Sequence, residues 1–505
     1  MNALQGLRKP TAIHWRYTPG MSARLAALPR HPPNTQLRLF AQQALSRAAG
    51  APLIGGNSVD LLIDGRANFD AWLAAIRGAR STILFENYIF RDDEVSREFR
   101  DALVERCAAG VQVYVIRDWL GCLGQSTARF WKPLIAAGGS VRSFGPPSLA
   151  NPFGGLSRNH RKVLVVDGES GFISGVCVSA RWLGDKDRRI APWRDTGIAL
   201  RGPAVREIAL AFGDSWARSG TPLAEDFSAF QPHSDDAGEV DVRVVATVPN
   251  AAGLYRLDQL IAAMAQRRLW LADAYFVGVA PYVQALAAAA RDGVDVRMLV
   301  PGTSDLPAIG ALSRAGYRTL LQSGVRVFEW NGSMMHAKSA VADGRWARVG
   351  SSNLNLASWL GNCEIDLAIE NEDFAARMEA QYEADLQNAT EIVLRTPRRR
   401  WGQRRDHNAV RKAGGSSGRA AAGALRLANS VGAAISNRRV LGPADGGIVL
   451  AGSTVLGALG VVALLWPRVL AWPLGALALW LAMQALVRYF IERRAAAIRD
   501  DDRCE

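Results

Sequence analysis

At residues 159–167 the chain reads Asn159-His160-Arg161-Lys162-Val163-Leu164-Val165-Val166-Asp167. This stretch places histidine, lysine and aspartate in the spacing His-x-Lys-x4-Asp. A second copy runs from Met335 to Asp343 and reads Met-His-Ala-Lys-Ser-Ala-Val-Ala-Asp. In both copies a short run of apolar or small residues follows the lysine and ends at Asp-Gly, which predicts a buried strand closed by a turn. Two copies of one half-site indicate a single site that both copies share.

The spacing also predicts which side chains meet. Residues two apart on a strand face the same side, so each histidine should lie beside its lysine. Lysine supplies a point charge for a phosphate oxygen, and histidine can act as nucleophile or proton donor near neutral pH. The candidate catalytic residues are His160, Lys162, Asp167, His336, Lys338 and Asp343.

Chance does not account for the duplication. The chain has 6 histidines and 60 lysines and arginines, of which only six are lysine. If its basic residues served only as solvated charge, nearly all of them should be arginine. The full pattern should then arise by accident on the order of 0.01 times per chain. Two copies therefore point to function.

The residues around each copy alternate strands and helices in the same order. In the first half we expect strands at 59–63, 83–90, 111–116 and 141–144, a turn at Asp64-Gly65, and helices at 67–80, 94–109 and 126–137. In the second half, which begins near Leu254, we expect strands at 269–276, 293–300 and 325–328 and helices at 281–291 and 309–323. A helix is also expected at 35–48, and another from Phe374 to about Ile392. Alternating strands and helices predict an α/β fold with parallel sheets, and the shared order predicts two tandem repeats.

The residues after each motif also correspond. Gly350-Ser351-Ser352-Asn353 follows Asp343 at the same distance at which Ser174-Gly175-Val176-Cys177 follows Asp167. Small residues and short hydrogen-bond donors suit close approach to a phosphate, although an ordinary tight turn is the alternative. The candidate phosphate-binding residues are Ser174, Ser351 and Asn353. Farther on, Asp195 and Glu364 are supporting candidates, because a carboxylate can hydrogen-bond and orient an imidazole.

The charge of the chain is concentrated in one segment. The formal net charge is +13, and residues 395–439 contain twelve lysines and arginines against one acid, Asp406. Such a segment attracts nucleic acid or an anionic membrane surface. The five cysteines lack the paired spacing of a disulfide framework or a zinc site, so we expect no metal and no cofactor, in a reducing compartment. The N-terminal residues carry scattered arginines and prolines and lack the apolar core of a signal peptide.

Two apolar stretches near the C-terminus predict a membrane hairpin. Residues 447–466 and 469–487 contain no charged residue, and each is long enough to cross a bilayer core of roughly 30 Å. A re-entrant or buried helix pair is the alternative. Arginines flank the hairpin on both outer sides, whereas Arg468 stands alone in the turn, so both ends should face the cytoplasm. The basic segment would then lie against anionic lipid headgroups, which favours lipid over nucleic acid as its partner.

The two motifs, with Gly-Ser-x-Asn after the second, resemble those of the phospholipase D superfamily, and within it the bacterial cardiolipin synthases. Three further stretches are similar to that family: Phe85–Asp93, Arg117–Gly121 and Trp193–Thr196. The resemblance covers about residues 55 to 395. It implies metal-independent phosphodiester exchange through a covalent phosphohistidine, in a cleft to which each α/β half supplies one motif.

The resemblance also implies residue roles. His160 would be the nucleophile and His336 the general acid and base, with the reverse assignment as the alternative. Lys162 and Lys338 would hold the phosphate oxygens, assisted by Ser351 and Asn353. The chain departs from the family pattern at Cys177, which stands where the second half has Asn353. The family also often carries its membrane segments at the N-terminus, whereas this chain has them at the C-terminus.

The function that these patterns predict is a phosphatidyltransferase that makes cardiolipin from phosphatidylglycerol, or from phosphatidylglycerol and another phospholipid. A hydrolase or nuclease of the same superfamily and a membrane-anchored, non-catalytic binding protein are the alternatives. We expect a bacterial inner-membrane protein whose catalytic part is cytoplasmic and whose substrate is an anionic phospholipid; the sequence fixes no oligomeric state. The expected parts are an N-terminal extension (1–54), a first repeat (55–235), a second repeat (236–395), a basic linker with a possible amphipathic helix (396–446), the hairpin (447–487) and a tail (488–505).

Overall fold

The computed structural model describes residues 35–147, 157–185, 187–231, 236–394 and 438–441, together with four single positions nearer the C-terminus. The chain divides into two units, Met1–Ala44 and Leu45–Glu505. Helix α2 (Thr35–Ala49) begins in the first unit and ends in the second, and it confirms the helix expected at 35–48. Everything below concerns the second unit.

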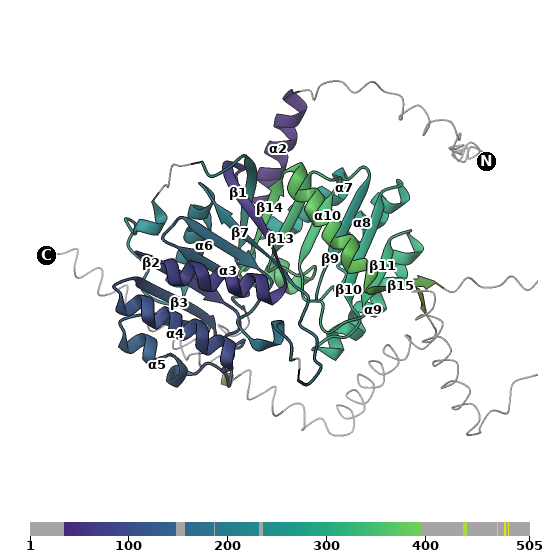
Figure 1. Ribbon diagram of the computed structural model, residues 1–505. Helices are drawn as coiled ribbons and strands as arrows, with labels where there is room; N and C mark the ends of the chain where they lie inside the picture. The colour runs from purple at the N-terminus through teal and green to yellow at the C-terminus, as the bar shows by residue number, and fades with distance from the viewer. Residues whose placement is uncertain are drawn as a thin grey trace, which may run out of the picture. The chain divides into compact units, whose positions relative to one another are not determined.

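A single mixed sheet runs through both halves of this unit (Figure 1). In the first half its strands lie in the order β1 (Ile54–Ile63), β7 (Thr196–Arg201), β6 (Ser170–Ser174), β5 (Val163–Val166), β2 (Thr82–Asn87), β3 (Gln112–Asp118) and β4 (Ser140–Phe144). Strands β2, β3 and β4 are parallel, and β5 is antiparallel to β2. The carboxyl ends of the three parallel strands therefore share one edge with the beginning of β5.

The second half repeats this order. Its strands are β8 (Val240–Thr247), β14 (Glu364–Glu370), β13 (Trp346–Gly350), β12 (Ser339–Ala342), β9 (Arg268–Ala272), β10 (Asp295–Pro301) and β11 (Arg326–Trp330), extended by β15 (Ala389–Leu394) and β16 (Arg438–Leu441). The parallel set is β9, β10 and β11, and β12 runs antiparallel to β9. The predicted α/β repeat is thus confirmed, but the expected parallel sheets are corrected to one mixed sheet, because β5, β6 and β7 and their counterparts β12, β13 and β14 pair antiparallel.

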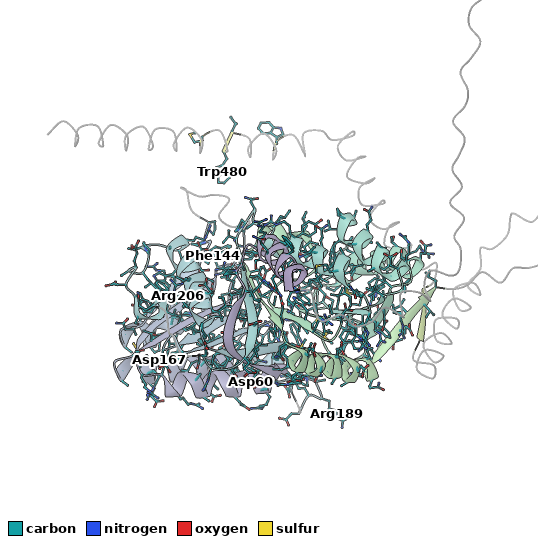
Figure 2. The ribbon with its side chains drawn as sticks, turned by 90° about the horizontal axis from the view of Figure 1, so that it is seen from above. Asp60, Phe144, Asp167, Arg189, Arg206 and Trp480 are labelled. Carbon is teal, nitrogen blue, oxygen red and sulfur yellow. The ribbon has the colours of Figure 1, made fainter. Side chains whose placement is uncertain are left out.

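The two halves join through their first strands. Strand β1 pairs antiparallel with β8, and the register shifts between Ile54 and Asn57. Asp60, on β1, lies between the two halves (Figure 2). Because each half contributes the same strand to this seam, corresponding edges of the two half-sheets can meet around one pseudo-symmetric site.

Helices cover both faces of the sheet. On one face α3 (Asp64–Gly78), α4 (Glu94–Ala108) and α5 (Ala128–Ala136) share an apolar core in the first half, and α7 (Gly253–Met264), α8 (Ala280–Arg291) and α9 (Pro307–Gln322) share another in the second. Helices α6 (Val205–Arg218) and α10 (Glu372–Gln387) pack on a third core that contains strands of both halves. Short helical turns occur at Ala180–Trp182, Ser228–Phe230 and Ala357–Gly361. The third core fastens the halves together beneath the site.

Strand β5 shows why its sequence is apolar throughout. Val163 and Val165 face the core under α6 and α10, whereas Leu164 and Val166 face the core under α3 and α4. Both faces of this strand are buried, as is typical of a central strand with helices on either side. Each fully buried side chain contributes about 1.5–3 kcal/mol relative to an exposed one.

The structure corrects several expected boundaries. Strands β5 and β12 begin after Lys162 and Lys338, so the histidines and lysines precede the strands instead of lying on them. Asp64 adopts a left-handed φ of 63° and begins helix α3, where a separate turn was expected. The helix expected to reach Ile392 ends at Gln387, because Ala389–Leu394 joins the sheet as β15.

The predicted C-terminal segments fall largely outside the described residues. These are the basic linker except for β16, the amphipathic helix at 419–435 and the hairpin at 447–487. Within the part of the chain that the structure describes, no helix is both long and apolar enough to cross a bilayer.

Candidate active site

Both motif histidines lie at the junction of the halves, held by backbone bonds from the opposite half. The N–H of His160 donates to the carbonyl of Cys363 (2.9 Å), and the N–H of His336 donates to the carbonyl of Arg194 (2.7 Å). Short parallel bridges, Asn159 with Cys363 and Arg194 with Met335, support these bonds. Each motif is therefore positioned by the residues just before β14 or β7 in the other half.

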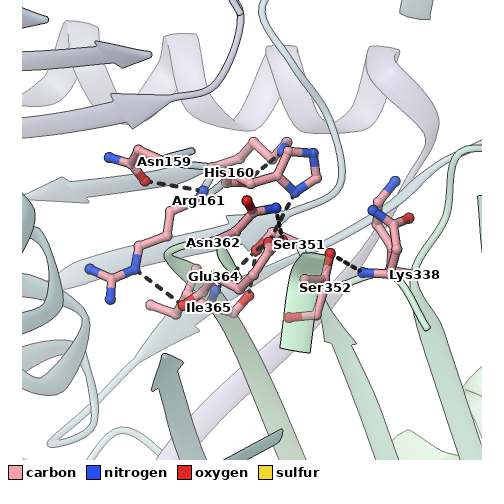
Figure 3. A network of polar contacts seen from close by, with 12 residues as sticks. Asn159, His160, Arg161, Lys338, Ser351, Ser352, Asn362, Glu364 and Ile365 are labelled. Carbon is pink, nitrogen blue, oxygen red and sulfur yellow. Dashed lines mark hydrogen bonds and ion pairs between the residues drawn. The ribbon is translucent and has the colours of Figure 1, made fainter. Parts of the chain in front are cut away.

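Each histidine also contacts a carboxylate that belongs to the opposite half. Nδ1 of His160 lies 2.9 Å from Oε2 of Glu364, and Nδ1 of His336 lies 2.8 Å from Oδ2 of Asp195. Figure 3 shows the imidazole of His160 directed at Glu364, with Ser351 on the same carboxylate. A bond at Nδ1 leaves Nε2 of each ring to face a reacting phosphate. Both supporting acids expected from the sequence are thus brought to the histidines, each to the one in the opposite repeat.

A second donor holds each carboxylate, and the two donors differ. Oε2 of Glu364 also accepts from the Ser351 hydroxyl (2.6 Å), and Oδ2 of Asp195 also accepts from Nε1–H of Trp182 (2.8 Å). In the first half Gly175 stands where the second has Ser351, and a Cβ there would lie 2.2 Å from Oδ1 of Asp195. The first half therefore excludes a serine at this position and uses an indole in its place.

Both motif lysines are fully buried. Nζ of Lys338 lies 3.0 Å from Nδ1 and 3.1 Å from Nε2 of His336, as the motif spacing predicts. Nζ of Lys162 donates to the backbone carbonyl of His160. Burial lowers the pKa of both ammonium groups, that of Lys338 to about 8, while neighbouring carboxylates oppose the shift. Among the described residues neither ammonium forms a direct ion pair, so each is a suitable partner for an incoming phosphate.

The two histidine–lysine pairs influence each other electrostatically. Burial is the largest cause that lowers the pKa of both imidazoles, that of His336 to about 4. The charge of Lys338 also lowers the pKa of His160, and the charge of Lys162 lowers that of His336. The pairs therefore occupy one electrostatic site. At neutral pH both rings are neutral before an anion arrives, which is the form that can attack phosphorus.

The loops after β6 and β13 align as expected. Ser174 N–H donates to the carbonyl of Lys162, and Gly350 N–H donates to that of Lys338. The side chain of Ser174, however, accepts a hydrogen bond from the backbone N–H of Val176 (3.0 Å). Ser174 thus shapes its own loop, a place that does not favour the phosphate contact assigned to it from sequence.

Asn353 and Cys177 occupy corresponding positions with different surroundings. Oδ1 of Asn353 is buried and has no hydrogen-bond partner among the described residues. Cys177 packs within the apolar core of the first half, and burial raises the pKa of its thiol to about 11. A phosphodiester anion only accepts hydrogen bonds, so it would bond the Nδ2–H groups of Asn353 and not Oδ1, whereas the thiol of Cys177 is a packed, neutral group.

Aromatic rings surround the two imidazoles, and the motif spacing did not predict them. The ring centroid of Tyr88 lies 4.9 Å from that of His160. The rings of Trp182, Trp193 and Tyr275 lie 5.3, 5.6 and 5.8 Å from that of His336. These rings reduce the access of water to both histidines. The only sequence signal was the presence of Tyr88 and Trp193 in stretches that resemble the family.

Two buried arginines anchor the segments that carry the site. Arg161 donates to the carbonyls of Ala211 (2.6 Å) and Glu364 (3.1 Å). Arg194 forms a two-point ion pair with Asp385 (2.9 and 2.8 Å). Each arginine is adjacent in sequence to a residue of the histidine–carboxylate pairs, so its bonds fix the orientation of that residue.

Asp167 and Asp343 require a correction, because the structure keeps them out of the site. They follow β5 and β12 at the far end, about 20 Å from the histidines along an extended chain. Both adopt left-handed φ angles, 55° and 53°, in the turns that end these strands. The Asp167 carboxylate accepts from three successive backbone N–H groups, those of residues 80–82, and Asp343 does the same for residues 266–268. The third motif residue thus fastens a turn to the neighbouring strand.

The arrangement as a whole suits phosphoryl chemistry. Two imidazoles whose Nε2 atoms are not bound to a carboxylate, two buried ammonium groups and a buried amide converge without a cluster of metal-ligating side chains in the described ranges. A phosphodiester placed between the imidazoles would meet a nucleophile on one side and a proton donor on the other.

Comparison with known proteins gives matches across both halves. The family model described as "Cardiolipin synthase, PLD-like domain" matches residues 72–184 and 258–386, and each range contains one histidine–lysine pair. A protein named "Cardiolipin synthase A" from Pseudomonas aeruginosa is 36% identical over 359 residues, which are 70% of this chain and 71% of that protein. A protein of the same name from Pseudomonas fluorescens is 32% identical over 390 residues, 76% of this chain and 78% of that protein.

One solved structure shares the fold. The phosphatidylserine synthase of Haemophilus influenzae aligns with a TM-score of 0.55 and 14% sequence identity, over 70% of this chain and 91% of that chain. The likeness concerns the two-half α/β architecture.

Proposed function

The chain belongs to the family of cardiolipin synthases with a phospholipase D-like domain, and we propose from its site that it is a phosphatidyltransferase that makes cardiolipin. Phosphatidylglycerol serves as donor, and a second phosphatidylglycerol serves as acceptor. The relatives' names and the length of the matches support this activity.

The observation that carries the proposal is the crosswise pairing of histidines and carboxylates. Glu364 of the second half binds His160 of the first, and Asp195 of the first binds His336 of the second. Neither half holds a complete site, so the chemistry requires both motifs at one phosphate. A non-catalytic binding protein would not need two imidazoles that are each oriented by a carboxylate at Nδ1.

In the first step Nε2 of His160 attacks the phosphorus of phosphatidylglycerol. A phosphorus–nitrogen bond forms, and the bond from phosphorus to the glycerol headgroup oxygen breaks. His336 donates its Nε2 proton to that oxygen, and glycerol leaves. The negative phosphodiester raises the pKa of His336 on binding, so the proton is present when the leaving oxygen needs it.

In the second step the headgroup hydroxyl of another phosphatidylglycerol gives its proton to Nε2 of His336. Its oxygen attacks phosphorus, the phosphorus–nitrogen bond breaks, and cardiolipin forms with His160 restored. Lys162 and Lys338 stabilise the negative oxygens of the pentacoordinate state, and Asn353 supplies a further hydrogen bond. Ser351 acts through Glu364, whose carboxylate it holds.

The membrane placement is part of the proposal. The apolar stretches at 447–466 and 469–487 serve as a helical hairpin in the bacterial inner membrane, with the catalytic halves on the cytoplasmic side. The domain boundaries inferred from the sequence are retained, with the two repeats meeting near residue 235. The basic segment before the hairpin would contact anionic headgroups.

A product assay tests this function. Purified full-length protein in detergent is incubated with phosphatidylglycerol, and the lipids are separated by mass. Cardiolipin with one glycerol per cardiolipin is the expected result. Phosphatidic acid as the main product would identify a hydrolase, and cleavage of DNA without lipid turnover would identify a nuclease. Trapping the phosphoenzyme by rapid acid quench and mapping it by peptide mass should place the phosphate on His160; phosphate on His336 would reverse the two roles.

Variants sharpen the same assay. His160→Ala and His336→Ala should each abolish cardiolipin formation, and His233→Ala, a histidine outside both motifs and outside the basic segment, should leave it unchanged. Activity that survives in either motif variant would contradict the shared site.

A further inference from the structure

The catalytic groups are buried, yet their proposed substrate resides in a bilayer. His160 is 9% exposed and His336 is 5% exposed, and both lysines are inaccessible. A lipid headgroup must therefore be drawn from the membrane into the domain. On the basis of the proposed function, we propose that a collar of exposed apolar side chains around the site docks the catalytic domain on an anionic phospholipid bilayer. The collar consists of Leu120, Leu123, Ile190, Leu306, Leu356 and Leu360.

The first part of the collar lies in the loop after β3. Leu120 and Leu123 are exposed, although the loop itself is tightly held. The carboxylate of Asp118 accepts from the backbone N–H of Leu120 and from that of Asn159, the residue before His160. These bonds keep the exposed leucines beside the His160 motif and leave their side chains in solvent.

The second part lies between two tryptophans that contact His336. Ile190 is exposed, and its backbone pairs with that of Asp185 in both directions (2.8 and 2.7 Å). Trp182 and Trp193 bracket this turn and pack against the ring of His336. Figure 2 shows Arg189, the neighbour of Ile190, projecting from the edge of the domain. This turn therefore extends outward from the wall of the site.

The remaining parts come from the second half and meet at Tyr275. Its hydroxyl donates to Asp305 (2.7 Å), the residue before exposed Leu306. Its backbone carbonyl accepts from the amide of Asn355 (2.9 Å), the residue before exposed Leu356. Leu360 follows one helical turn later. Since the ring of Tyr275 lies beside His336, both loops border the same opening.

The chemistry of the collar favours a lipid surface over a protein partner. Its six apolar side chains project one or two at a time from four separate loops, whereas protein interfaces bury a contiguous patch. Exposed cations accompany them: Arg129 and Lys132 follow Leu123 with no acidic residue between 119 and 132, and Arg181 precedes the Ile190 turn. Peripheral proteins bind anionic membranes through this combination. Apolar side chains enter the interface, and neighbouring cations bind the lipid headgroups.

The test compares two forms of the same substrate. The full chain is reconstituted in phosphatidylcholine vesicles and supplied either with long-chain phosphatidylglycerol in the bilayer or with short-chain phosphatidylglycerol as monomers in solution. A variant combining Leu120→Ser, Leu123→Ser, Leu306→Ser and Leu356→Ser should lose at least about tenfold in the rate on the bilayer substrate. Its rate on the monomeric substrate should stay within about twofold, because the catalytic groups are unchanged.

Controls use exposed apolar residues at the opposite edge of the sheet. Ile135→Ser and Met264→Ser alter side chains near the ends of α5 and α7, where the chain returns to the beginnings of β4 and β9. Neither should change the rate on either substrate. If the combined variant is poorly folded, Leu123→Asp alone provides the comparison, since that side chain is 58% exposed in a loop.

Each outcome decides the matter. A rate on the bilayer substrate equal to wild type, or an equal loss on both substrates in a folded variant, would overturn the collar while leaving the transferase intact. A wild-type protein that makes no cardiolipin from either substrate would overturn the proposed function, and the collar with it.

Discussion

Nδ1 of His336 lies 2.8 Å from Oδ2 of Asp195, a residue of the opposite half. The same relationship, reversed, joins His160 to Glu364. A site built in this way cannot be assembled from one half alone. It also ties the activity of each motif to the position of the other repeat.

The first prediction concerns these carboxylates. Asp195→Asn and Glu364→Gln keep the size of each side chain but remove the charge that stabilises an imidazolium. We expect each to lower kcat by roughly 10²–10⁴-fold with little change in KM, because the loss falls mainly on the transition state. Steady-state rates of cardiolipin formation measure it. Asp60→Asn, which alters an exposed side chain of β1, serves as the matched control, and an Asp195 or Glu364 variant that retains wild-type kcat would contradict the orienting role.

The second prediction separates the hydrogen bond of the Trp182 indole N–H from the packing of its ring. Trp182→Phe keeps an aromatic ring against His336 but removes the Nε1–H bond to Asp195. We expect kcat to fall by about tenfold, the cost of one lost hydrogen bond to a charged group, and the acidic limb of the pH profile to move. Trp193→Phe, which alters a neighbouring ring without a carboxylate bond, should change kcat by less than about twofold. Equal effects of the two variants would show that only ring packing matters.

The third prediction assigns Asp167 to stability. Its carboxylate binds the N–H groups at the start of β2, so Asp167→Asn should lower the free energy of unfolding by about 1–2 kcal/mol, a figure reduced for its partial exposure. The kcat of the folded protein at low temperature should remain near that of wild type. Thermal unfolding and initial rates on the same preparation check both parts. A large loss of kcat without a change in the thermal midpoint would show that Asp167 takes part in catalysis.

The order of the elements could be predicted because it depends on local patterns that occur twice. Strand, helix and motif follow each other in both halves, and β2 to β5 reappear as β9 to β12. The crosswise pairing could not be predicted, since it depends on which strands meet across the β1–β8 seam. The predicted strand between Lys162 and the turn at Asp167 already separated Asp167 from His160, yet the sequence alone did not show that the Asp167 carboxylate binds the backbone at the start of β2 instead of the site. Trp182 was missed because no spacing rule links an indole to a carboxylate.

The fourth prediction uses the difference between Asn353 and Cys177. The amide of Asn353 carries Nδ2–H donors from which a phosphate oxygen can accept, whereas the thiol of Cys177 is part of the apolar core. Asn353→Ala should therefore reduce kcat/KM by about tenfold or more, through loss of a phosphate contact. Cys177→Ala removes only a small buried group and should cost less than about threefold. The two variants are measured side by side; similar losses would show that the phosphate is held symmetrically after all.

The fifth prediction concerns pH. Burial foremost, then the charge of Lys338, lowers the pKa of His336 to about 4, against about 6.5 in an unfolded chain. Between these values the unfolded chain binds more protons, so the stability that the neutral ring contributes is present above pH 6.5 and lost as the pH falls towards 4. The loss amounts to at most about 3 kcal/mol. Burial raises the pKa of Asp195, but its contact with His336, the charge of Lys338 and the hydrogen bond from Trp182 together hold it below its usual value, so protonation of Asp195 acts in the same direction at lower pH.

Thermal midpoints of substrate-free protein at pH 7 and pH 5 measure this effect. Between pH 7 and pH 5 the thermal midpoint of wild type should fall more than that of His336→Gln. Glutamine does not titrate, so the variant lacks the proton that the unfolded wild-type chain takes up at this position. His160→Gln should show the same sign, since burial also lowers the pKa of that ring. If wild type and both variants lost the same amount between the two pH values, the imidazoles would not be held neutral in the folded protein. The proton used in the first step would then be present before the substrate arrives.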